Sequence, residues 1–140
     1  MGRKIVLIVD DEPEIHELLK AYLAPLNLEI YSAYNGDQGI EIYRKLLKNG
    51  KKPHLVVMDL NLSGSEKLED MKKQMEGIEM DGVRATMEIF KIDGKANIVG
   101  FTAYAHLEWG KKLKKIGVME VFGREIGFDG FAQKVSSILS

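Results

Sequence analysis

The sequence alternates between two hydrophobic periods, and this alternation limits the possible folds more than any other feature. Residues 5–9 (IVLIV) form a continuous, mostly β-branched run, which is typical of a strand buried on both faces of a sheet. Residues 14–26 then place apolar side chains at helical spacing, and Pro13 suits the first turn of such a helix. Because the two patterns keep alternating, the sequence predicts parallel βαβ units, with helices on both faces of one sheet.

Five strands and five main helices are predicted in this way. The predicted strands cover residues 5–9, 28–33, 54–58, 97–101 and 118–122, and the predicted helices cover residues 14–26, 35–48, 80–92, 103–116 and 128–139. The 140 residues have the size of one domain, so we expect residues 1–140 to form a single domain. The fold class is therefore α/β, a doubly wound five-stranded parallel sheet.

A charged, Met-rich segment around residues 64–79 is longer than an ordinary loop between a strand and a helix. Ser63 and Glu66 have the spacing of a capping box, and apolar residues after them fall on one helical face. We expect an extra short helix here. Its charge density favours a solvated decoration, while its methionines leave open a lid or a docking element.

Composition excludes several classes of protein. The formal net charge of −1 gives no overall attraction to nucleic acid or anionic lipid, and the absence of cysteine excludes disulfides and thiolate chemistry. No stretch approaches the roughly 20 apolar residues needed to span a bilayer, and no signal peptide is recognisable. By default, these features predict a soluble cytoplasmic protein.

Acidic residues follow two of the predicted strands. The first strand ends in Asp10, Asp11 and Glu12, and the third runs directly into Asp59. Because ligands of parallel α/β sheets bind at the carboxyl ends of strands, three carboxylates are expected to converge there. Oxygen ligands of this kind suit Mg²⁺. A simpler interpretation is that Asp11 or Glu12 caps the following helix.

Two further residues stand at the ends of the fourth and fifth predicted strands. Thr102 offers a hydroxyl and Arg124 a guanidinium to an anion held above Asp59. A hydroxyl, a cation, Mg²⁺ and backbone N–H groups are the recurring parts of phosphoryl-transfer sites, which act by positioning and charge stabilisation. The ordered set indicates phosphoryl chemistry more strongly than any one residue.

Taken together, the chain resembles the receiver domain of two-component response regulators. The resemblance is carried by VDDE at residues 9–12, VVMD ending at Asp59, MDG at residues 80–82, FTA at residues 101–103 and the segment from Gly117 to Arg124. It implies the flavodoxin-like strand order 2-1-3-4-5. It also implies a signalling module rather than an enzyme, capable only of self-phosphorylation and slow autodephosphorylation.

The resemblance also implies roles for individual residues. Asp59 would accept a phosphoryl group from a histidine kinase or phosphotransfer protein, and signalling would follow by contact with a downstream protein, without nucleic acid or membrane. Mg²⁺ would be held by Asp11, Asp59 and the Asn61 carbonyl, with Asp10 ligating directly or through water. Thr102 and Arg124 would contact the phosphoryl group, and Tyr104 would slow its hydrolysis.

The sequence departs from the family pattern where Arg124-Glu125 replaces a Lys-Pro pair and Val121 replaces a switch aromatic. These departures favour an alternative, a degenerate receiver that binds partners without phosphorylation. A hydrolase of the haloacid-dehalogenase type would need an acid at position 61, where the chain has Asn61. His16 and His106 lack a second metal ligand at useful spacing, so both are expected on helix surfaces.

Overall fold

The structure is a computed structural model of the chain, and it describes residues 2–59, 81–103, 111 and 113–140. Within this part, five parallel strands form one sheet in the order β2-β1-β3-β4-β5, which confirms the predicted fold class. The strands are β1 (Ile5–Val9), β2 (Glu29–Ala33), β3 (Leu55–Met58), β4 (Ile98–Thr102) and β5 (Glu120–Gly123). The predicted extra helix at residues 64–79 lies outside the described residues, as does most of the predicted helix at 103–116.

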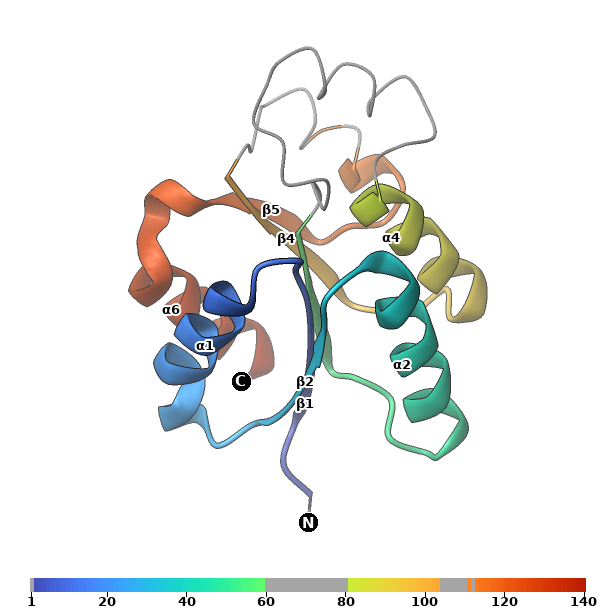
Figure 1. Cartoon of the computed structure of the whole chain (residues 1–140), viewed down its shortest axis with the longest axis horizontal. Helices are drawn as coiled ribbons and strands as arrows, with labels where there is room; N and C mark the ends of the chain where they lie inside the picture. Colours follow the sequence, from blue (N-terminus) through green and yellow to red (C-terminus); the bar gives the residue numbers. More distant parts are fainter. Residues whose placement is uncertain (1, 60–80, 104–110, 112) are drawn as a thin grey trace.

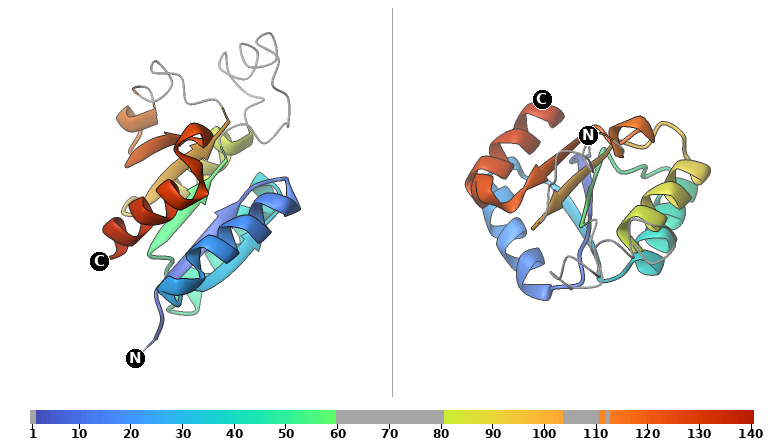
Figure 2. Two further views of the ribbon diagram at one scale, coloured as in Figure 1. Left: turned by 90° about the vertical axis from the view of Figure 1, so that its left-hand side faces the viewer. Right: turned by 90° about the horizontal axis from the view of Figure 1, so that it is seen from above.

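Four α-helices can be assigned bounds within the described residues, and two lie on each face of the sheet (Figures 1 and 2). The helices are α1 (Pro13–Leu23), α2 (Gly36–Lys48), α4 (Asp81–Ile92) and α6 (Gly127–Leu139). Helices α1 and α6 pack together on one face, and α2 and α4 on the other. None of these helices is long and apolar enough to cross a bilayer.

The burial of strand β1 explains why its sequence does not alternate between apolar and polar residues. All five of its residues are buried. Leu7 and Val9 pack into the core beneath α2 and α4, while Val6 and Ile8 pack into the core beneath α1 and α6. A strand covered on both faces needs apolar side chains at every position. β1 lies between β2 and β3, so the residues after Val9 emerge beside the end of the middle strand, β3.

The end of α1 differs from the prediction of a helix to residue 26. The α-helix ends at Leu23, and a 3₁₀ turn covers Ala24–Leu26. Pro25 has no backbone N–H to donate to the carbonyl four residues earlier, so the α-helical ladder cannot continue through it. Asn27 then adopts a left-handed conformation and its N–H closes the turn on Ala24.

Candidate functional site

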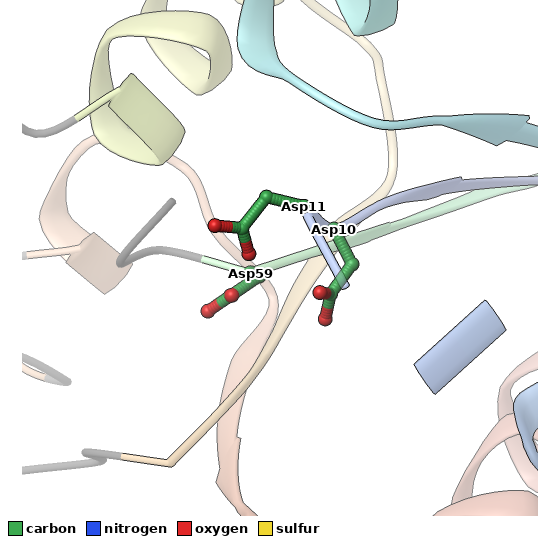
Figure 3. Close-up of side chains that lie close together, drawn as sticks. All are labelled: Asp10, Asp11 and Asp59. Carbon is green, nitrogen blue, oxygen red and sulfur yellow. The ribbon is translucent and has the colours of Figure 1, made fainter. Parts of the chain in front are cut away.

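The strand ends bring three carboxylates together, as predicted. Asp10 and Asp11 follow β1, and Asp59 follows the neighbouring strand β3 (Figure 3). One oxygen from each of the three side chains lies within 4.8 Å of the others. Asp10 and Asp59 are buried, with 3% and 8% of their surface exposed. Three acids so close together repel one another unless a cation or proton lowers their joint charge.

Asp10 is fixed by hydrogen bonds to every polar group that it carries. Its N–H donates to the carbonyl of Ala33 (3.0 Å), and its own carbonyl accepts from His16 Nε2 (2.7 Å). Its Oδ1 accepts from the Glu12 N–H (2.9 Å), and its Oδ2 accepts from Arg124 Nη2 (2.9 Å). Asp10 is therefore a rigid, already partnered member of the cluster.

Burial raises the pKa of Asp10 to about 6, against the opposing effects of the Glu12 N–H and the Arg124 guanidinium. The Glu12 N–H and the Arg124 guanidinium both favour the charged form of this carboxyl. The helix-capping interpretation of these acids receives no support from Glu12, which occupies the N-cap position of α1 but makes no side-chain capping bond. Asp10 Oδ1 accepts from the Glu12 N–H at the start of this turn.

Arg124 lies inside the site, not on the outer surface of an edge strand. It follows β5, and its side chain reaches back past the ends of β4 and β3 to Asp10, which follows β1. Nη2 also donates to the carbonyl of Phe101 (3.3 Å), and the guanidinium carbon lies 4.8 Å from the centre of the Phe101 ring. Its Nε is buried and makes no hydrogen bond to the described residues. The guanidinium thus presents positive charge at the acidic cluster.

Thr102 is the last residue of β4 and is fully buried. Because β4 lies next to β3, its hydroxyl belongs to the same sheet edge as Asp59. At the end of β5, Val121 packs on the α2 and α4 side, whereas Phe122 packs on the α1 and α6 side. The prediction that Val121 and Phe122 point to opposite faces of the sheet is confirmed. Position 121 therefore presents an aliphatic side chain to the α2 and α4 side.

His16 was expected on a helix surface, and this prediction is wrong: the residue is fully buried. The signal was present in the sequence, because His16 precedes Leu19 by three residues and Leu23 by seven, and both are buried on the same face of α1. Leu18 and Tyr22, by contrast, are 42% and 46% exposed. The buried face of α1 is therefore rotated towards His16.

The donor set fits Mg²⁺. Carboxylate oxygens are hard ligands, and Mg²⁺ is typically bound by one or two carboxylates together with water. Asp11 and Asp59 would hold the ion, with Asp10 beside them. The predicted fourth ligand, the Asn61 carbonyl, lies outside the described residues, as do Tyr104 and His106.

Residues 6–136 match the family model described as the response regulator receiver domain. The sporulation initiation phosphotransferase F of Bacillus subtilis is 25% identical over 139 residues, which cover 99% of this chain and 96% of that protein.

Solved structures share the fold. The response regulator TrrA from Thermotoga maritima, in complex with Mg²⁺ and BeF, is 28% identical with a TM-score of 0.68, covering 96% of this chain and 98% of that chain. CheY from Borrelia burgdorferi, in a complex with CheX, BeF₃ and Mg²⁺, is 19% identical with a TM-score of 0.77, covering 98% of this chain and 90% of that chain.

Proposed function

Because the chain belongs to the response regulator receiver domain family, we propose that Asp59 is its phosphoacceptor. The observation that carries the proposal is the convergence of Asp10, Asp11 and Asp59 at the ends of two adjacent central strands. A receiver is a signalling module that takes a phosphoryl group on a carboxylate. Asp59 combines burial with a position at the carboxyl edge of the sheet, where ligands of such folds bind.

In the proposed reaction, an Asp59 carboxylate oxygen attacks the phosphorus of a phosphohistidine. The phosphorus–nitrogen bond breaks, the imidazole of the donor leaves, and Asp59 becomes an acyl phosphate. When bound, Mg²⁺ supplies positive charge to the phosphoryl oxygens and orients them. Thr102 donates its hydroxyl to a phosphoryl oxygen, and the Nε of Arg124 supplies a further donor from the side of β5.

We propose protein partners on both sides of this reaction. The donor is a histidine kinase or phosphotransfer protein, in keeping with the phosphotransferase name of the Bacillus relative. The acceptor of the signal is a downstream protein that binds one state of residues 1–140 better than the other. CheY in the similar structure is in complex with a protein, CheX. A cytoplasmic location and the absence of turnover beyond self-phosphorylation and slow autodephosphorylation belong to the same proposal.

Intact-mass spectrometry after incubation with Mg²⁺ and acetyl phosphate tests the proposal. We expect the mass of the chain to rise by one phosphoryl group, and we expect Asp59→Asn to prevent this. Asp37→Asn is the matched control, because Asp37 is an exposed aspartate whose ion pair is with Arg84 on α4. Labelling of Asp59→Asn to the wild-type level would contradict the assignment.

The hold of Arg124 on Asp10 favours a second candidate, a receiver that binds partners without phosphorylation. In this state, Arg124 already neutralises one acid of the cluster. The contact is a charge-assisted hydrogen bond from Nη2 to Asp10 Oδ2. The same experiment separates the two functions, because this candidate predicts no labelling of the wild-type chain. It also predicts that a partner isolated with the chain binds Asp59→Asn equally well.

A further inference from the structure

His16 is a buried ring that the proposed reaction does not use. It lies on α1, its Nε2 is 2.7 Å from the Asp10 carbonyl oxygen, and its Nδ1 is 3.0 Å from Ser32 Oγ on β2. A carbonyl oxygen can only accept, so Nε2 carries the proton. Burial lowers the pKa of His16, which favours a neutral ring whose Nδ1 accepts from the Ser32 hydroxyl.

The bond from His16 fixes more than the position of Asp10. The carbonyl of Asp10 and the N–H of Asp11 belong to the same planar peptide unit, so holding that oxygen sets the direction in which Asp11 leaves β1. The N–H of Asp10 is held separately by Ala33. Both contacts depend on residues at the end of β2. Ser32 contacts the imidazole of His16, which in turn contacts the carbonyl of the Asp10–Asp11 peptide unit.

Tyr34 holds the other side of the imidazole. The two ring centres are 4.4 Å apart, and Tyr34 is 40% exposed, so it lies between His16 and solvent. The backbone N–H of Tyr34 donates to Gln38 Oε1 (2.8 Å), which fixes the tyrosine at the start of α2. The ring of His16 is therefore held between a hydroxyl, a carbonyl and an aromatic side chain, with one orientation that satisfies both nitrogens.

We propose that His16 is a positioning residue for the acidic site: through the Asp10 carbonyl, it sets Asp11 at the separation from Asp59 that a divalent cation requires. This inference rests on the metal-binding half of the proposed function. Groups that orient metal ligands without touching the metal commonly change its affinity by about 10–100-fold when removed. A shift of about 1 Å in a ligand is sufficient to weaken such a site.

The test is a Mg²⁺ titration of the unphosphorylated chain by isothermal calorimetry at fixed pH and salt. His16→Leu keeps the volume and removes the donor, and we expect it to weaken Mg²⁺ binding by about tenfold or more. His16→Gln keeps a donor near Nε2 and should restore most of the affinity. Tyr43→Phe is the matched control: it removes a hydrogen bond of a fully buried ring on the other face of the sheet, so it should lower stability and leave Mg²⁺ affinity unchanged.

Wild-type affinity in folded His16→Leu would overturn the inference, and so would the absence of Mg²⁺ binding by the wild-type chain. If His16→Leu does not fold, long-range ¹H–¹⁵N spectra of the wild-type imidazole decide: a proton on Nδ1 instead of Nε2 contradicts the proposed contact. Failure of the proposed function gives a different result. In that case acetyl phosphate does not label Asp59, while the Mg²⁺ affinity still depends on His16.

Discussion

A buried tyrosine hydroxyl on α2 provides a stability prediction at the scale of single residues. Tyr43 donates to Asp93 Oδ2 (2.7 Å), and Lys52 pairs with the same oxygen (3.1 Å). The hydrogen bond from Tyr43 is the main reason that the pKa of Asp93 lies below its ordinary value of 3.8. We expect Tyr43→Phe to lower the free energy of unfolding at neutral pH by roughly 1–2 kcal/mol, since the bond is to a charged acceptor.

The sign of the pH dependence follows from the lowered pKa of Asp93. A carboxylate with a lowered pKa stabilises the fold above its unfolded value of about 3.8, and this stabilisation is lost as pH falls through the folded value. The difference between wild type and Tyr43→Phe should therefore shrink as pH falls below about 4. Urea unfolding across the acid range measures it, with exposed Tyr22→Phe as control. A difference that stays constant down to acid unfolding would refute the assignment.

At this scale the sequence predicted the acidic residues of the site, but not the residues that hold them in place. Asp10, Asp11 and Asp59 were predictable because each follows a strand whose residues are apolar at every position. The ion pair of Arg124 with Asp10 was not, because a position after a strand does not specify how far a long side chain reaches back across the sheet. His16 was missed because a polar residue on a helix is usually solvated.

At the scale of elements, the contact between α2 and β1 depends on a glycine. A Cβ at Gly39 would lie 2.9 Å from Val9 Cγ2 and 3.1 Å from Val9 Cγ1, and Val9 is fully buried. Alanine at position 39 gains about 1 kcal/mol in helix propensity, while overpacking of a core costs about 1–3 kcal/mol. We therefore expect Gly39→Ala to destabilise the protein by roughly 1 kcal/mol in chemical denaturation.

A second substitution, at Val9, removes the steric contact that alanine at position 39 would make. Val9→Ala deletes both methyl groups that the new Cβ would meet, so Gly39→Ala in that background should be neutral or stabilising. The double-mutant cycle then reports a coupling of about 1–2 kcal/mol between helix and strand. Additive effects of the two substitutions would show that α2 shifts freely over β1.

The strands and helices were more predictable from sequence than the places where they end. Each predicted strand overlaps an observed one, because period and burial determine the type of element. The first strand has the predicted bounds, while the others differ by one or two residues at one or both ends, since hydrogen bonding to neighbouring strands sets these ends. The fourth strand, for example, begins at Ile98 and extends through Thr102. The 3₁₀ turn at Ala24–Leu26 follows from Pro25, a local signal weaker than the surrounding apolar pattern.

At the scale of the whole molecule, the order of the strands came from the family resemblance and not from periodicity. Hydrophobic periods specify which elements form and which faces they bury. All strands that are buried on both faces have similar apolar sequences, so the periods do not specify their order in the sheet. The order β2-β1-β3-β4-β5 places β1 and β3 side by side at the centre. That adjacency turns two separate sequence motifs into one acidic cluster, so the site is a property of the topology.

This topology makes the stability of the whole chain depend on Mg²⁺. The unfolded chain does not hold Asp10, Asp11 and Asp59 together, so a cation at their cluster binds the folded state alone. Ligand at a hundredfold excess over its Kd adds about 2.7 kcal/mol to the free energy of unfolding. For a domain of this size, we expect Tm to rise by roughly 5–10 °C on Mg²⁺ saturation. Differential scanning calorimetry with and without Mg²⁺ measures the rise.

Replacing one acid of the cluster should remove the dependence of stability on Mg²⁺. Without a cation, the three carboxylates repel one another, so Asp11→Asn should melt at or above the wild-type temperature when Mg²⁺ is absent. The same variant should lose most of the rise on Mg²⁺ addition, because a ligand oxygen has lost its charge. Asp37→Asn, which changes an exposed carboxylate paired with Arg84, should keep the full rise. If Mg²⁺ raised the Tm of Asp11→Asn as much as that of the wild type, the cation would bind elsewhere. The repulsion within the acidic cluster would then destabilise the fold without being offset by a bound cation.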